Sequence, residues 1–171
     1  MPRLSDLEAA ASTMTRTAFS TRYPTPVLVP VRIIGGSVRR SQPQDRNATM
    51  MHGARDWERT AIEVASAVTL APGAGGRSAA SLLRIGRDWS CDVKIADYTV
   101  SKSHAIWRPG KQRDPDTLED QGSRNGTWVG KTRLKPGQPH PVRSGDEVRF
   151  GRMVLTFYKP AQLYDFLRES R

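Results

Sequence analysis

Short β-favouring runs recur through the second half of this chain about every ten residues, and this recurrence limits the folds that it can adopt. Gly, Pro, Asn and Asp stand between the runs as turn residues. A chain punctuated in this way is typical of an all-β sandwich or barrel, in which short strands alternate with turns. The runs cover residues 82–85, 93–95, 104–108, 117–120, 127–129, 140–142, 147–150 and 153–158.

Three segments before these runs are less regular. Apolar residues of 60–70 fit helical or strand spacing equally well, and the turn-rich stretch that follows favours a strand forming a hairpin with residues 82–85. Residues 27–34 are also β-rich, but Pro26 and Pro30 restrict them to a sheet edge or to an extended strap across the core. Residues 35–55 lack periodicity and are predicted to form a mobile loop.

Short helices are predicted at both ends of the chain. Ser5 and Glu8 have the spacing of a capping box, which predicts a helix within residues 4–16. Pro160 suits a first helical turn, and Leu163, Phe166 and Leu167 then share one face. We therefore expect a short amphipathic C-terminal helix that packs on the sandwich.

Composition limits the size and compartment of the protein. At 171 residues and 19.0 kDa the chain fits one domain with extensions, and its apolar share of 37% indicates that part of it lies outside a compact core. A single cysteine, Cys91, excludes an internal disulfide and indicates an intracellular protein. No apolar stretch is long enough to span a bilayer, and residues 1–11 do not resemble a signal peptide. The sequence predicts a soluble, cytoplasmic protein.

The net charge of +10 favours acidic partners such as phosphopeptides, nucleic acid or anionic surfaces. The basic residues stand singly or in pairs and are interrupted by Asp and Glu, so they form no basic helix face. A well-solvated basic surface explains this pattern better than a dedicated site for an acidic partner does.

Four motifs interrupt the β-runs in a fixed order between Leu83 and Gly151. Each alone fits an ordinary turn, because Gly-Arg and Asn-Gly pairs are common in turns. The motifs are Ile85-Gly86-Arg87 followed by residues 91–95, Val100-Ser101-Lys102-Ser103-His104-Ala105, residues 120–130 (DQGSRNGTWVG) and residues 145–151 (GDEVRFG). Together they resemble the forkhead-associated (FHA) domain, a phosphothreonine-binding β-sandwich.

The resemblance implies an FHA-like β-sandwich of about 10–11 short strands, with short helices at the N- and C-termini. The predicted organisation is an N-terminal helical extension (1–24), an extended segment with a mobile loop (25–59), the FHA domain (60–159) and a C-terminal helix (160–171).

Residues that suit a phosphate ligand occur in the first two motifs. Arg87 follows Gly86, which allows tight backbone geometry, and its planar guanidinium suits charge-assisted bonds to phosphate. Without the other motifs, Arg87 would fit a solvated turn. The resemblance implies that Arg87 meets the phosphate, that Ser101 donates its hydroxyl to it, and that Lys102 adds a backbone amide and charge.

The third motif adds residues for the peptide itself. Asn125 can donate and accept through its amide, and the resemblance implies that it pairs with the peptide main chain. Arg124 stands where many FHA domains have a smaller residue, so it either adds a contact to the phosphate or to an acidic residue of the peptide, or crowds the niche for the threonine methyl group. The resemblance places Thr99 where residues C-terminal to the phosphothreonine are read. Gly86, His104, Ser123 and Gly126 are expected to shape the site.

The sequence therefore predicts a phosphothreonine-peptide-binding module that mediates phosphorylation-dependent interactions in Ser/Thr kinase signalling. Its expected partner is a phosphothreonine-containing protein, a Ser/Thr kinase or its substrate. The alternative is a basic scaffold that binds nucleic acid or a non-phosphorylated partner. An enzyme using Ser101 and His104 is disfavoured, because strand residues three apart face opposite sides and no Asp is placed to orient the imidazole. No metal or cofactor motif is present in the sequence.

Overall fold

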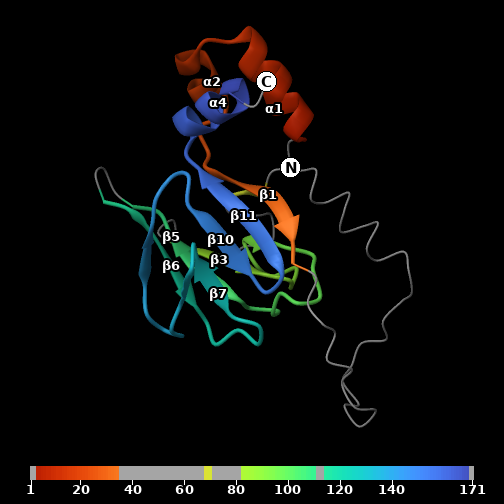
Figure 1. Cartoon of the computed structure of the whole chain (residues 1–171), viewed down its shortest axis with the longest axis vertical. Coiled ribbons are helices and arrows are strands. Elements are labelled where there is room, and N and C mark those ends of the chain that lie inside the picture. Colours follow the sequence, from red (N-terminus) through yellow and green to blue (C-terminus); the bar gives the residue numbers. More distant parts are fainter. Residues whose placement is uncertain (1–2, 35–67, 71–81, 111–113, 170–171) are drawn as a thin grey trace, which may run out of the picture.

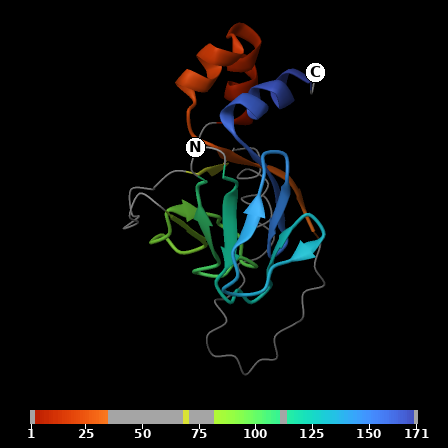
Figure 2. The ribbon, with the colours of Figure 1, turned by 90° about the vertical axis from the view of Figure 1, so that its left-hand side faces the viewer.

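Two β-sheets pack face to face, and a layer of helices lies at one end of the sandwich (Figure 1, Figure 2). The computed structural model describes residues 3–34, 68–70, 82–110 and 114–169. Eleven strands lie within these residues, and they confirm the predicted all-β sandwich with short terminal helices. The mobile loop predicted for residues 35–55 lies outside the described residues.

Neighbouring strands are antiparallel throughout the sandwich, except for the parallel pair β3 and β4. The six-stranded sheet has the order β2 (Val68–Thr69), β1 (Val27–Ile33), β11 (Met153–Tyr158), β10 (Glu147–Phe150), β7 (Thr127–Val129) and β8 (Thr132–Arg133). The five-stranded sheet has the order β4 (Val93–Lys94), β3 (Leu83–Gly86), β5 (Ala105–Arg108), β6 (Asp116–Asp120) and β9 (His140–Val142).

Alternating burial along the strands builds the main core. In β5 and β6, Ala105, Trp107 and Leu118 are completely buried, as the period of two predicts for a sheet with one covered face. The Trp107 ring lies 4.6 Å from that of Phe157 on β11, and its indole N–H donates to Asp116 at 2.9 Å. This aromatic pair joins the two sheets.

Proline shapes the path of β1. The strand pairs with β11 along its length, and its register shifts between Pro30 and Arg32. On its other side, β2 pairs only with Val27 and Leu28. Within the described part of the chain, Pro30 thus lies beside a bulge, at a point where no strand pairs with the other side of β1. The missing N–H of proline therefore removes no hydrogen bond between strands.

The predicted hairpin between residues 60–70 and 82–85 is wrong. Val68 and Thr69 form a strand, but it pairs with β1 in the six-stranded sheet, whereas β3 belongs to the opposite sheet. The Leu70 amide donates to the Pro26 carbonyl at 2.9 Å, and Leu70 is buried in the core between the sheets. Residues 60–67 and 71–76 lie outside the described residues.

The predicted N-terminal helix occurs as two, α1 (Leu4–Thr13) and α2 (Arg16–Arg22). The predicted capping box is wrong, because α1 begins after Arg3 with no side-chain cap, which places Ser5 inside the first turn. Thr15 instead caps α2 by accepting the Ala18 amide at 3.3 Å.

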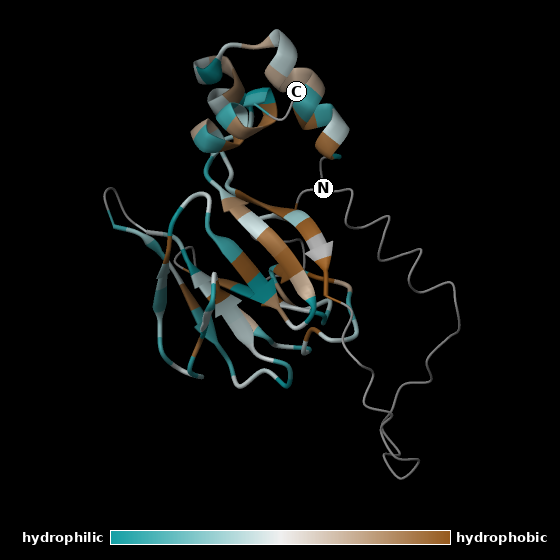
Figure 3. Cartoon of the chain, viewed as in Figure 1, coloured by the Kyte–Doolittle hydropathy of each residue, from teal (hydrophilic) through white to brown (hydrophobic). Residues whose placement is uncertain are grey.

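The predicted C-terminal helix is α4 (Pro160–Glu169), with Leu163 and Leu167 buried. It packs mainly against α1 and α2. Its buried leucines form a second apolar cluster with Leu7 and Phe19, and this cluster also covers Val27 and Val29 on the outer face of β1 (Figure 3). Its direct contact with the sandwich includes Phe166, which stacks on Tyr158 at 4.7 Å. No helix among the described residues has the length and apolarity that crossing a membrane requires.

Candidate functional site

The loops that carry the predicted site residues lie at the end of the sandwich away from the helices (Figure 1). Strand registers explain this placement. Val27, which follows α2, pairs with Tyr158, which precedes α4, so the helices share one end. Phe150 pairs with both Thr127 and Met153 at the other end, where the β6–β7 loop also lies.

Gly86 lets the end of β3 approach the β4–β5 loop closely. A β carbon at this position would lie 2.1 Å from the Lys102 carbonyl oxygen and 2.9 Å from Cys91 Sγ. The next two backbone amides donate to carbonyls of the β4–β5 loop: Arg87 to Ser101 at 2.9 Å and Asp88 to Lys102 at 3.2 Å. Glycine is therefore required by this backbone contact, which also positions Arg87.

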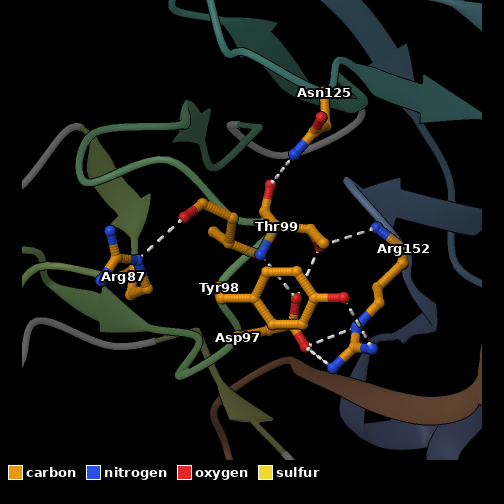
Figure 4. A network of polar contacts seen from close by, with 7 residues as sticks. Arg87, Asp97, Tyr98, Thr99, Asn125 and Arg152 are labelled. Carbon is orange, nitrogen blue, oxygen red and sulfur yellow. Dashed lines mark hydrogen bonds and ion pairs between the residues drawn. The ribbon is translucent and has the colours of Figure 1, made fainter. Parts of the chain in front are cut away.

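Arg87 is oriented but only partly buried. Its Nε donates to the Val100 carbonyl at 3.3 Å (Figure 4). No described residue binds its two terminal nitrogens. The guanidinium can therefore present those N–H groups to an anion in the bidentate geometry that arginine favours.

His104 joins two loops from a completely buried position. Its Nδ1 accepts the Ser101 amide at 2.9 Å, so Nε2 carries the proton and donates to the Gly126 carbonyl at 3.1 Å. Burial lowers the pKa of His104, against smaller opposing effects of the Gly126 carbonyl and Asp120. The neutral imidazole therefore connects the β4–β5 and β6–β7 loops.

Ser101 also connects these loops through its side chain. The hydroxyl accepts the Arg124 amide at 3.1 Å, and its own hydrogen stays available for donation. Because His104 contacts the amide of Ser101 instead of its hydroxyl, the two side chains are not arranged as a nucleophile and its base.

Asp120 organises the β6–β7 loop, a role that sequence reasoning missed. Its buried carboxylate accepts the amides of Gly122 and Ser123 at 2.9 Å and the hydroxyls of Ser123 at 2.6 Å and Thr127 at 2.5 Å. Burial acts to raise the pKa of Asp120, but the bonds from Ser123 and Thr127 outweigh it and lower the pKa. The signal was present in the third motif, since Asp before Gly and Ser is typical of a side-chain-capped turn.

Asn125 reaches from that loop to the β4–β5 loop. Its Nδ2 donates to the Thr99 carbonyl at 2.7 Å (Figure 4). Thr99 is itself held, because its amide and hydroxyl donate to Asp97 and its hydroxyl accepts the Arg152 amide at 3.0 Å.

Arg152 forms an ion pair with the buried Asp97 beneath this contact, and neither residue was predicted. Arg152 Nε and Nη2 lie 2.8 and 2.7 Å from Asp97 Oδ2, and the guanidinium lies 4.3 Å from the Tyr98 ring centroid (Figure 4). Gly151 allows the approach, since a β carbon there would lie 2.6 Å from Thr99 Oγ1. No local pattern predicts a pair so far apart in sequence.

The structure thus links most of the predicted site residues through cross-loop hydrogen bonds. Lys102 and Arg124 are exposed beside Ser101 and Asn125, and their side chains add positive charge to that of Arg87. The arrangement suits an anion with an extended backbone beside it. Among the described residues, no group of His, Cys, Asp and Glu side chains could hold a metal ion.

Comparison with known proteins identifies the segment that carries these loops. Residues 83–151 match the family model of the FHA domain. The chain is 40% identical over 87 residues to angiogenic factor with G patch and FHA domains 1 of Mus musculus, covering 47% of this chain and 12% of that protein. It is 34% identical over 71 residues to protein FraH of Nostoc sp., covering 39% and 24%. This chain therefore aligns with a quarter or less of either relative.

Among solved structures, the chain is similar to Mycobacterium tuberculosis EmbR in complex with a low-affinity phosphopeptide. The two sequences are 23% identical, the TM-score is 0.45, and the match covers 58% of this chain and 23% of that one. With the family match, the four motifs and the β-sandwich in agreement, residues 83–151 of this chain are an FHA domain.

Proposed function

We propose that this chain binds a phosphothreonine-containing peptide at the three linked loops and mediates phosphorylation-dependent protein interactions in Ser/Thr kinase signalling. The observation that carries this proposal is the set of hydrogen bonds that brings Arg87, Ser101 and Asn125 to one surface. The partner is a phosphothreonine-containing protein, a Ser/Thr kinase or its substrate. The division of the chain at residues 24, 59 and 159 stays a prediction.

The phosphate is bound by Arg87, Ser101 and Lys102. A phosphothreonine carries a charge of about −2 at neutral pH, so charge-assisted hydrogen bonds are its strongest anchors. The terminal nitrogens of Arg87 and the hydroxyl hydrogen of Ser101 are the donors, and Lys102 adds charge. Because the loops are already tied together, little ordering is required on binding.

The peptide backbone is bound by Asn125. Its Nδ2 is engaged by the Thr99 carbonyl, which orients the amide oxygen to accept a peptide N–H. The Thr99 hydroxyl already binds Asp97 and the Arg152 amide, so Thr99 acts by holding Asn125.

The activity is binding without catalysis. The imidazole of His104 is buried and contacts the backbone through both nitrogens, so it is not placed to take a proton from Ser101.

Titration calorimetry with phosphothreonine peptides tests the proposal. Arg87→Ala and Ser101→Ala should each weaken binding by about 1.5–3 kcal/mol, or about tenfold to a hundredfold. Arg143→Ala is the matched control, because Arg143 is exposed at the helical end of the sandwich. Unchanged affinity in a folded Arg87 or Ser101 variant, or equal binding of the unphosphorylated peptide, would refute the site.

A second titration separates the peptide contact from the phosphate contact. Asn125→Ala should lose peptide affinity and keep affinity for inorganic phosphate, because its amide is assigned to the main chain. Parallel loss of both ligands would show that Asn125 holds the phosphate donors in place.

A third titration tests whether the site distinguishes phosphothreonine from phosphoserine through the threonine methyl group. Burial of one methyl group is worth about 1 kcal/mol, so matched peptides should show about a fivefold to tenfold preference for phosphothreonine over phosphoserine. If Arg124 fills the methyl niche, wild type will bind both equally and Arg124→Ser will restore the preference. Equal affinities in both proteins would mean that only phosphate charge is recognised.

A further inference from the structure

Two arginines and a tryptophan form a row across the six-stranded sheet, which we call the arginine–tryptophan ladder: Arg133 on β8, Trp128 on β7 and Arg149 on β10. Trp128 is the direct cross-strand partner of both arginines. The guanidinium carbon of Arg149 lies 3.2 Å from the Trp128 ring centroid, and that of Arg133 lies 5.3 Å from it. The ladder occupies the outer face of the sheet, because the flanking residues of β7 and β10 are buried.

The ladder adjoins the site described above. A β carbon built on Gly126 would lie 2.9 Å from Arg133 Nε and 2.8 Å from the Trp128 ring. The head group of Arg133 therefore reaches back over the Asn125–Gly126 turn. A residue that flanks the phosphothreonine in a peptide bound at Asn125 would therefore be within reach of this arginine.

The two guanidinium groups concentrate positive charge that no described carboxylate pairs with directly. Neither Arg133 nor Arg149 forms an ion pair within the described part of the chain. Burial and then the charge of Arg133 lower the pKa of Arg149, while Glu147 on the same strand acts to raise it. Two like charges that affect one another in this way are stabilised by a bound anion.

We propose that the arginine–tryptophan ladder is a second oxyanion subsite, which binds a carboxylate or a second phosphate on the same peptide whose phosphothreonine is held by Arg87 and Ser101. This inference rests on the proposed function. Stacking on Trp128 restricts the arginine rotamers before binding, so less side-chain entropy is lost when an anion meets their N–H groups.

The geometry favours an acidic peptide over a nucleic acid. Nucleic-acid-binding proteins expose aromatic rings on which bases stack. Here Arg149 already lies against the Trp128 ring, and Trp128 is only partly exposed. What the ladder presents is guanidinium N–H groups, which recognise oxyanions.

Peptides with one phosphothreonine and different flanks test the subsite by titration calorimetry. The reference has neutral flanks; a first set places a single Glu at each flanking position in turn, and a second set places a phosphoserine there. Wild type should prefer one acidic position about fivefold to tenfold over the reference, less than for the phosphate contacts because solvent screens the exposed guanidinium of Arg133. The Glu and phosphoserine sets distinguish a carboxylate from a phosphate as the natural ligand.

The variants Arg133→Gln and Arg149→Gln should abolish that preference and leave the reference peptide bound as in wild type. Arg133→Lys, which keeps the charge, should retain part of it, and Arg143→Gln should retain all of it. Thermal melts verify that each variant is folded.

The outcomes separate the two proposals. No binding of any phosphothreonine peptide refutes the proposed function and the subsite with it. Binding without acidic preference, or a preference that survives both Gln variants, overturns the subsite alone. Binding of a single-stranded oligonucleotide that both Gln variants abolish, with peptide affinities unchanged, would assign the ladder to nucleic acid instead.

Discussion

The two ends of the sandwich are stabilised by different interactions. At the helical end, apolar side chains such as Leu7, Phe19 and Leu163 are buried against one another and against β1. At the loop end, the buried groups include Asp97, His104 and Asp120, each satisfied by hydrogen bonds within its own loop or to a neighbouring loop. Apolar packing is non-directional and supplies stability, whereas hydrogen bonds fix orientation. The partly buried Arg87 and the exposed Asn125 therefore depend on the polar end for their placement.

The largest expected effect separates stability from binding at the helical end. Phe19→Ala removes a completely buried ring and should lower the free energy of unfolding by about 3–5 kcal/mol. Peptide affinity of the folded fraction should not change, because the site lies at the opposite end. Urea unfolding and calorimetry measure the two quantities, with Thr17→Ala on the same helix as the exposed control. A parallel fall in affinity would show that the two ends are coupled.

Two ion pairs, one at each end of the sandwich, allow the effect of burial on stability to be compared by mutation. The side chains of Arg152 and Asp97 are 21% and 1% exposed, against 53% and 42% for Arg16 and Asp165. Arg152→Gln should cost about 2–4 kcal/mol, since it leaves a buried carboxylate without its cation. Arg16→Gln should cost less than about 1 kcal/mol, because solvent screens the exposed pair.

Only the Arg152 variant should also weaken peptide binding, because the Arg152 side chain holds Asp97, and Asp97 accepts from Thr99, whose carbonyl holds Asn125. Adding Asp97→Asn to Arg152→Gln should recover part of the stability by removing the unpaired charge. Equal effects of Arg152→Gln and Arg16→Gln in urea unfolding would contradict the distinction between the two ends.

The smallest expected effect is a pH dependence at the loop end. The pKa of His104 is lowered in the folded protein, so below its ordinary value of 6.5 the unfolded chain binds a proton that the folded chain does not. Stability should therefore fall as the pH drops below 6.5 toward the folded pKa, because protonation of Nδ1 removes the acceptor for the Ser101 amide. Urea unfolding at a series of pH values should show this slope in wild type and in His140→Gln. A similar slope in His104→Asn would assign it to another group.

Most of the strand pattern was predictable because it is local. All eight runs predicted from residue 82 onward coincide with strands to within one residue, since alternation and turn residues act over neighbouring positions. The two-residue strand β8 was missed, because Thr132 and Arg133 are both exposed and give no apolar alternation. The capping box failed for a similar reason, as sequence spacing does not show at which residue a helix begins.

The site residues were predictable to the extent that they lie in motifs. Arg87, Ser101 and Asn125 were found in this way, and the loops bring them together. Asp97 and Arg152 were missed because their contact joins residues from the β4–β5 loop and the β10–β11 turn, and neither stands out from its neighbours.

The short strands between turns and the four motifs in FHA order can be inferred from the amino-acid sequence, because turn chemistry and alternation depend on adjacent residues. The assignment of β2 and β3 to different sheets, the support that Arg152 gives to the Thr99 loop, and the placement of Arg133 and Arg149 beside Trp128 follow from the tertiary structure. Most of these contacts join residues far apart in the chain. Their energy depends on burial and mutual geometry, which exist only once both sheets have formed.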